Sequence, residues 1–410
     1  MKKLLLVLLI LSLFINHLNA NEKDLQIIQK DKKEYRLLDK ESIQTRQQSQ
    51  KYDWISPIDL SGNIGRNHSF SDENSRNLNN KNTKSASIGF TQSIFESGGI
   101  GFKMDYADNR FKYEMLSWEN QNSQLIYTIY NTLLDIKKLK LEINQNEYRI
   151  VNKDIELIIK KIQYEAGKTD IIELNNAIMS KNLIQKEEIA LKNSLKEKEQ
   201  ELAKYTDLKY DEIEILDFQE TNKEIFLDKN YSILEADAKV EMLNSEYKIK
   251  KSQYLPKLSL SAKASYSNQD EKFNSMINDT NKDDATSSGS LILSMPLYDY
   301  TKSSKIQESK IEVLKQKALV NDLKNETAFE YEQIFTKIDT YLKQNETINK
   351  NIKLYEELIG ANQISSEAGM TSKYDLEILE NTKTINEFDI LINKINILQQ
   401  YAKLYFKIKN

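Results

Sequence analysis

The stretch Tyr254-Leu255-Pro256-Lys257-Leu258-Ser259-Leu260 decides the fold, because a close counterpart of it occurs earlier in the same chain. The counterpart is Ile55-Ser56-Pro57-Ile58-Asp59-Leu60-Ser61, about 200 residues upstream. In both stretches a proline precedes residues whose apolar and polar side chains alternate. This pattern is typical of a β-strand that begins at a proline and has one apolar face.

Two further landmarks recur in the same order and at nearly the same spacing. Ile94-Phe95-Glu96 is matched by Leu297-Tyr298-Asp299, and Glu165-Ala166-Gly167-Lys168-Thr169 by Glu367-Ala368-Gly369-Met370-Thr371. The sequence therefore predicts two copies of one unit. Each unit is expected to contain a helix, a strand, a polar loop, a second strand, a very long helix, a turn at the glycine and a return helix.

The domain boundaries follow from this repeat. The first repeat is expected over 21–206, with a β-hairpin at 56–96, a long helix at 100–166 and a return helix at 170–206. The second is expected over 231–410, with a β-hairpin at 255–298, a long helix at 300–366 and a return helix at 372–407. Residues 207–230 lack a clean period and are predicted to form a small equatorial segment beside the helices.

The first residues, 1–20, have the features of a cleaved secretory signal peptide. Met1-Lys2-Lys3 is a basic start, the apolar run from Leu4 to Ile15 is too short to span a bilayer, and Ala20 is a small residue before the cut. An uncleaved N-terminal anchor is the alternative. After this segment no apolar run is long enough for a transmembrane helix, so a membrane location would require a barrel.

The composition argues against an enzyme. The chain has no cysteine, which excludes disulfides, thiol catalysis and a lipid anchor on cysteine. Of two histidines, His17 lies in the signal and His68 in a polar stretch, so a catalytic triad or a zinc site would need His68 nearly alone. We expect no catalytic residue, cofactor or metal. The net charge of −4, without a basic stripe, argues against nucleic acid.

The strands have one apolar and one polar face. The apolar positions are Ile58, Leu60, Ile64; Ala86, Ile88, Phe90, Ile94; Leu258, Leu260, Ala262, Ala264, Tyr266; and Leu291, Leu293, Met295, Leu297. Small polar residues, mostly serine, alternate with them. A soluble half-buried sheet also alternates. Strands of about 9–12 residues and a small polar opposite face favour a membrane barrel with a wet lumen.

Polar stretches at Ser69–Lys84 and Ser267–Ser287 are expected to be exposed loops of the two hairpins. Four strands are too few for a barrel, since the smallest use about eight. At least two chains must therefore share one barrel.

Long, uninterrupted helices are predicted because only 3 prolines and 10 glycines occur in 410 residues. A helix of this length reaches about 100 Å. Narrow apolar seams at heptad spacing mark the two long helices and the second return helix. They comprise Ile129, Thr132, Ile136, Leu139, Ile143, Asn146, Ile150, Leu157; Ile334, Ile338, Tyr341, Asn345, Ile348, Ile352, Tyr355, Ile359; and Ile385, Phe388, Ile392, Ile395, Ala402. Such seams fit a hollow cylinder of helices, and an antiparallel coiled-coil bundle remains the alternative.

This arrangement resembles the TolC-like outer-membrane efflux protein family over essentially the whole mature chain. The resemblance rests on the repeat, on the two glycine turns, and on the strand motifs Tyr254-Leu255-Pro256-Lys257-Leu258-Ser259-Leu260 and Ser294-Met295-Pro296-Leu297-Tyr298-Asp299. It implies a mainly α fold with a membrane β-barrel portion, in which a homotrimer shares one twelve-strand barrel continued by a long periplasmic α-helical tunnel. It also implies outer-membrane lipid, a periplasmic adaptor (membrane fusion) protein and an inner-membrane pump as partners.

The resemblance further implies an acidic periplasmic aperture just after the glycine turns. Asp375 matches the first acidic position of the family, whereas Ile378 stands where a second aspartate is expected. Glu173 is the equivalent in the first repeat, and three symmetry copies of either would favour cations. Either residue could instead stabilise a helix N-terminus. Neighbouring candidates are Lys168, Thr371, Glu377 and Glu380.

The sequence favours a passive export duct of a tripartite efflux or type I secretion system. The main alternative is a soluble periplasmic coiled-coil adaptor or scaffold, although adaptors carry compact β-domains rich in glycine turns, which this chain lacks. An enzyme is the third possibility, but Gly98-Gly99-Ile100-Gly101 is better explained as a strand-to-helix corner than as a phosphate loop.

Overall fold

The computed structural model describes residues 25–69, 79–216, 218, 220–272, 280–367 and 372–409. The predicted signal peptide, Gly369 and Thr371 lie outside these residues. Two compact units share the chain: unit 1 comprises 1–40, 116–235 and 321–410, and unit 2 comprises 41–115 and 236–320. The fold class is confirmed in its coarse form, a mainly helical chain with one antiparallel sheet.

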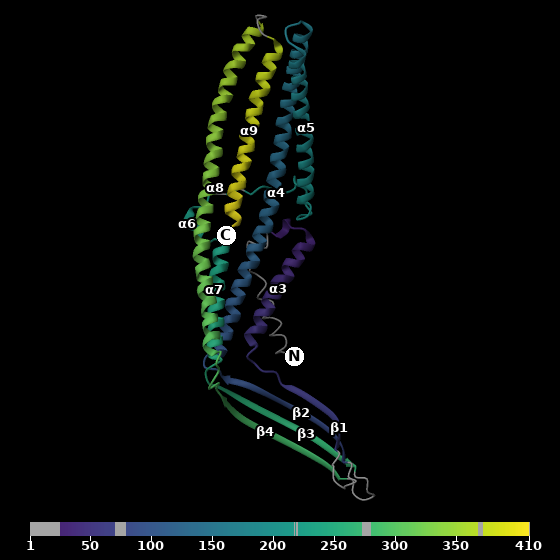
Figure 1. Cartoon of the computed structure of the whole chain (residues 1–410), viewed down its shortest axis with the longest axis vertical. Coiled ribbons are helices and arrows are strands. Elements are labelled where there is room, and N and C mark those ends of the chain that lie inside the picture. The colour runs from purple at the N-terminus through teal and green to yellow at the C-terminus, as the bar shows by residue number, and fades with distance from the viewer. Residues whose placement is uncertain are drawn as a thin grey trace, which may run out of the picture. The chain divides into compact units, whose positions relative to one another are not determined.

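Seven α-helices occur among the described residues, labelled as in Figure 1: α3 Lys30–Tyr52, α4 Gly99–Glu165, α5 Ile171–Leu202, α6 Lys223–Asp228, α7 Tyr231–Ser252, α8 Lys302–Glu367 and α9 Lys373–Phe406. A short 3-10 helix, η2, covers Leu25–Ile27. Helices α4 and α8 contain 67 and 66 residues without a break. Within the described residues, none of the helices combines the length and the apolar character needed to cross a membrane.

The sheet belongs to unit 2 and consists of β1 Asp59–Ser69, β2 Asn79–Phe95, β3 Lys257–Lys272 and β4 Thr280–Ser294. All neighbours are antiparallel and the order is β1-β2-β3-β4 (Figure 1). The expected strand length of 9–12 residues was too short, since β2, β3 and β4 have 17, 16 and 15 residues. The predicted loops were correspondingly too long, because backbone pairing continues through polar residues after the apolar alternation has ended.

The first return helix also differs from its prediction. It was expected to reach residue 206, but α5 ends at Leu202. The amides of Tyr205 and Thr206 turn back to the carbonyl of Leu202, and the carbonyl of Tyr205 then accepts a hydrogen bond from the amide of Gln29 at 2.8 Å. Pairing with the N-terminal segment thus replaces the last turn of the helix.

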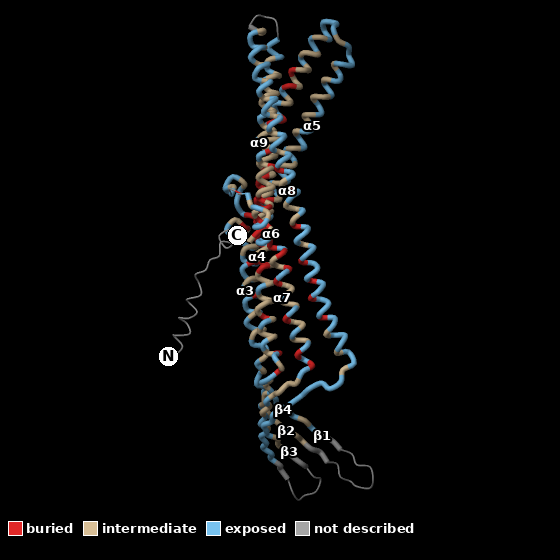
Figure 2. The backbone as a smooth tube through the Cα atoms, turned by 90° about the vertical axis from the view of Figure 1, so that its left-hand side faces the viewer, coloured by how far each residue is buried: buried red, intermediate tan, exposed pale blue. Residues whose placement is uncertain are grey.

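The core of unit 1 surrounds the middle of α4 (Figure 2). Its fully buried apolar residues on α4 include Ile126, Ile129, Leu133, Leu134 and Ile136. The narrow seam predicted for α4 is too narrow here, because positions on either side of it, such as Leu133 and Leu134, are buried as well. On α8, the predicted seam residues Ile334 and Ile338 are buried and join Phe226, Leu404 and Ile408 in one cluster.

The chain end completes this core. The amide of Tyr231 donates to the carbonyl of Lys407 at 2.9 Å, and the amide of Lys409 donates to the carbonyl of Lys229 at 2.8 Å. Phe406 stacks on Tyr130 and meets Phe218 edge-on, with ring centroids 5.5 and 5.7 Å apart. The residues after α9 therefore form a short backbone bridge to the start of α7.

Candidate functional site

The polar face of the sheet is a wall of short hydroxyl side chains. Ser61 and Ser87 lie 2.8 Å apart, Thr91 and Ser261 3.1 Å, and Ser265 and Thr286 2.7 Å, each pair bridging two neighbouring strands. Cross-strand pairs of this kind stabilise a sheet. The hydroxyl groups can also form hydrogen bonds with water, so this face of the sheet is suited to contact with solvent.

The opposite face carries large apolar side chains that are exposed. Leu60 is 79% exposed, Ile64 84% and Leu293 72%. Alternation places these residues on one face of the sheet. A contiguous exposed apolar surface of this size marks a surface meant for contact with lipid or protein. The sheet thus has one face suited to water and one that avoids it.

The turn between α4 and α5 is closed by Gly167, whose φ of +68° is in the left-handed region. The amide of Lys168 donates to the carbonyl of Gln163 at 2.8 Å, and the amide of Gly167 to that of Tyr164 at 2.9 Å. These two bonds form a Schellman motif, which ends a helix sharply. The motif accounts for the predicted glycine turn, and Lys168 contributes its backbone to it while its side chain is exposed.

Glu173 and Asp375 occupy the same place, the third residue of α5 and of α9. The amide of Glu173 donates to the carboxylate of its N-cap Asp170 at 2.9 Å, and its own carboxylate pairs with Lys160 at 3.1 Å. Both partners of this ion pair are more than one third exposed, so it adds little stability.

Asp375 takes part in a capping box with Ser372. Its carboxylate accepts from the amide of Ser372 at 3.3 Å, while the hydroxyl of Ser372 accepts from the amide of Tyr374 at 3.2 Å. A capping box stabilises the first turn of a helix. Asp375 is nevertheless exposed, as are Glu377 and Glu380, so three carboxylates lie within the first two turns of α9. The aperture assignment of these residues stays a prediction.

Hydrogen bonds between α4 and α9 join the two predicted repeats, and sequence reasoning missed them. The amide of Gln399 donates to Asp135 at 2.7 Å and that of Gln145 to Asp389 at 2.7 Å. Nearer the turns, the amide of Asn381 donates to Asn152 at 2.9 Å. The sequence feature that could have indicated these bonds is the set of asparagine and glutamine residues on the helices. Those that form these bonds lie outside the predicted heptad seams, so the seams did not indicate them.

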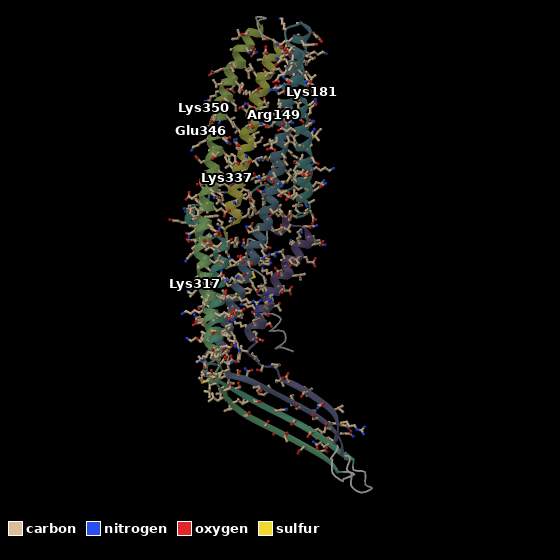
Figure 3. All side chains as sticks on the ribbon, viewed as in Figure 1. Arg149, Lys181, Lys317, Lys337, Glu346 and Lys350 are labelled. Carbon is tan, nitrogen blue, oxygen red and sulfur yellow. The ribbon has the colours of Figure 1, made fainter. Side chains whose placement is uncertain are left out.

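Helices α4 and α5 are joined by ion pairs at their surface and by an amide. Lys181 pairs with Asp154 at 2.6 Å and Arg149 with Glu187 at 3.7 Å. Figure 3 labels Arg149 and Lys181 on these two helices. The side-chain amide of buried Asn146 donates to the carbonyl of Ile184 at 3.2 Å. Contacts within the first repeat thus add surface charges, which salt screens, to the kind of amide bond seen between the repeats.

Comparison with known proteins gives one match to a family model. Residues 224–403, which contain most of the second predicted repeat, match the model of the Outer membrane efflux protein family. This match agrees with the resemblance drawn from the repeat and the glycine turns. No curated protein matches the chain in sequence.

Solved structures of outer-membrane channels share the fold of this chain. The outer membrane protein VceC of Vibrio cholerae has 12% identity and a TM-score of 0.71, with 94% of this chain and 93% of that one covered. The CmeC outer membrane channel of Campylobacter jejuni has 12% identity and a TM-score of 0.67, covering 93% and 86%. The open-state MtrE channel of Neisseria gonorrhoeae has 11% identity and a TM-score of 0.66, covering 94% and 88%.

Proposed function

We propose that the protein is a subunit of an outer-membrane export duct that leads from the periplasm to the cell exterior. The observation that carries the proposal is the two-faced sheet, with exposed Leu60, Ile64 and Leu293 on one side and paired hydroxyls on the other. A barrel wall with lipid outside and water inside requires this combination. The match of residues 224–403 to the Outer membrane efflux protein family supports it.

A duct of this kind is an oligomer, because the described sheet has two edge strands. Within the described residues, strands β1 and β4 each pair with a neighbour on one side only. An unpaired edge in a bilayer is costly, and closure with the strands of other copies removes it. A homotrimer with twelve strands, built from two repeats per chain, fits the expected architecture. The long helices would then continue the barrel into the periplasm, after removal of the signal peptide 1–20.

Partners and aperture are part of the same proposal. A periplasmic adaptor and an inner-membrane pump would supply energy and substrate to a duct that has no chemistry of its own. The exposed carboxylates of Asp375 and Glu173 would narrow and charge the periplasmic mouth. The hydrogen bonds Asn381–Asn152 and Gln145–Asp389 would hold the mouth, since they join the two helix pairs.

The soluble alternative, an adaptor or scaffold, is not favoured. It would need another element to cover the apolar face of the sheet, and Leu60 and Leu293 are more than two thirds exposed. Burying such surface is worth about 25 cal/mol per Å², so a soluble protein would not leave it open.

Single-channel conductance of the mature protein in a planar bilayer tests the proposal. Stable, cation-selective steps are expected, with larger steps or weaker selectivity for Asp375→Ala. Ser372→Ala is the matched control, because it removes the other half of the capping box without changing the charge. Equal effects of the two variants would assign Asp375 to capping alone. Folded protein that never conducts would overturn the duct.

A further inference from the structure

One row across the sheet carries two opposite charges. Asp59 on β1 lies opposite Gly89 on β2, Gly89 lies opposite Lys263 on β3, and Lys263 lies opposite Ser288 on β4. Neighbouring strands are about 4.8 Å apart, so Asp59 and Lys263 lie about 10 Å apart across Gly89. From one edge of the sheet to the other, the row therefore contains an acidic residue, a glycine without a side chain, a basic residue and a serine.

Both charges are on the polar face. Asp59 and Lys263 line one hollow of about 430 Å³, together with the hydroxyl residues Ser61, Ser87, Thr91 and Ser261. The hydroxyl pairs Ser61–Ser87 and Thr91–Ser261 lie in the rows on either side of the charges. Because the serine and threonine side chains are neutral, the aspartate and the lysine supply the charge of this hollow.

Gly89 leaves the space between the two charges open. A Cβ atom at this position would lie 3.0 Å from the carbonyl oxygen of Ala262 and 3.3 Å from Cγ of Lys263. The aliphatic part of Lys263 therefore lies against the bare backbone of β2. A larger residue at 89 would push the lysine away from the wall.

We propose that Asp59 and Lys263 form a charge-balanced girdle around the lumen, so that this part of the barrel prefers neither anions nor cations. The inference rests on the proposed function, since it needs the polar face to line a shared pore. In a trimer the row supplies three carboxylates and three ammonium groups. A strand tilt of about 40° separates the two kinds by about 6 Å along the pore axis, which is within the Debye length of about 10 Å at 0.1 M salt.

The described side chains of this face include two further charges. They are Lys257 and Asp284, which occur in different rows and also have opposite signs. The net charge of the described part of the wall is therefore zero. This part of the barrel would then pass solutes of either sign, and the periplasmic mouth would contribute the selectivity.

Reversal potentials in a planar bilayer under a KCl gradient test the girdle. Asp59→Asn should shift the ratio of anion to cation permeability toward anions, and Lys263→Gln toward cations. Three like charges about 10 Å from the axis shift the energies of an anion and of a cation in opposite directions, so they change this ratio by about five- to seventyfold, depending on screening. The double variant should return to the wild-type ratio. So should the exchange of the two residues, Asp59→Lys with Lys263→Asp.

Lys84→Gln is the matched control. Lys84 is exposed and pairs with Ile64 and Asn268, which places it on the apolar face of the same sheet. Its loss changes the charge of the chain by the same amount but should leave the ratio unchanged. Single variants that match this control, or that shift the ratio in the same direction, would overturn the girdle. A wild-type protein that forms no channel would instead overturn the proposed function.

Discussion

Phe226 is expected to hold the equatorial segment and the chain end in place. It is 0% exposed and packs in the cluster with Ile334, Ile338, Leu404 and Ile408. Its helix, α6, has six residues, too few to be stable by itself. Replacing a buried phenylalanine by alanine costs about 3–5 kcal/mol. Phe226→Ala should therefore open this region far more often than it opens in the wild type.

Hydrogen exchange reports such opening at single amides. The amides of Tyr231 and Lys409 are suitable reporters, because they close the bridge between the start of α7 and the chain end. A loss of about 3 kcal/mol corresponds to exchange about 100-fold faster, at 1.4 kcal/mol per factor of ten. Mass spectrometry of the detergent-solubilised protein measures this change.

Ile225→Ala is the control, since Ile225 is the preceding residue of α6 and is 44% exposed. It should cost about 1 kcal/mol and accelerate exchange about fivefold. If Phe226→Ala accelerates exchange at Tyr231 and Lys409 no more than Ile225→Ala does, the cluster does not support the bridge and the reasoning is refuted.

Two further predictions concern stability. Burial raises the pKa of Glu330, but hydrogen bonds and charge from Lys403 and Lys407 outweigh it and hold that pKa below 4.5. The folded state thus binds this proton less readily than the unfolded state, so this contribution to stability is present above pH 4.5 and is lost as the pH falls through the folded pKa. Glu330→Gln should melt below the wild type at pH 7, and the difference should shrink as the pH is lowered below 4.5; a difference that does not change with pH would contradict the assignment. Gly167→Ala should lower the free energy of unfolding by about 1–2 kcal/mol, because φ at this position is +68°. Gly360→Ala should raise it by about 1 kcal/mol, because Gly360 lies inside α8 with open space around it. Melting temperatures that change in the same direction for both variants would contradict this explanation.

Much of the helical and sheet framework could be predicted, because it depends on local pattern. The start of β3 at Lys257 follows from Pro256. The end of α4 at Glu165 follows from Gly167, because glycine adopts a positive φ angle at little cost. The burial of Ile334 and Ile338 follows from their heptad spacing.

What could not be predicted depends on contacts between distant segments. Leu133 and Leu134 lie beside the α4 seam, so their burial requires further elements packed against α4. The pairing of Gln29 with Tyr205 ends α5 earlier than its sequence pattern predicts. Hydrogen bonds such as Asn381–Asn152 join residues far apart in the chain, so no local pattern marks them. The opposite charges of Asp59 and Lys263 come into one row of the sheet only through the strand register.

The bridge between Lys229–Tyr231 and Lys407–Lys409 has a consequence for the order of events during biogenesis. A chain is made from its N-terminus, so the amide of Tyr231 waits for the carbonyl of Lys407, which is synthesised much later. Unit 1 likewise draws on three separate stretches, the last of which begins at residue 321. This unit therefore cannot complete its core until that last stretch has been made, and a nascent chain that ends before Leu404 would leave Phe226 without this partner and open to chaperones.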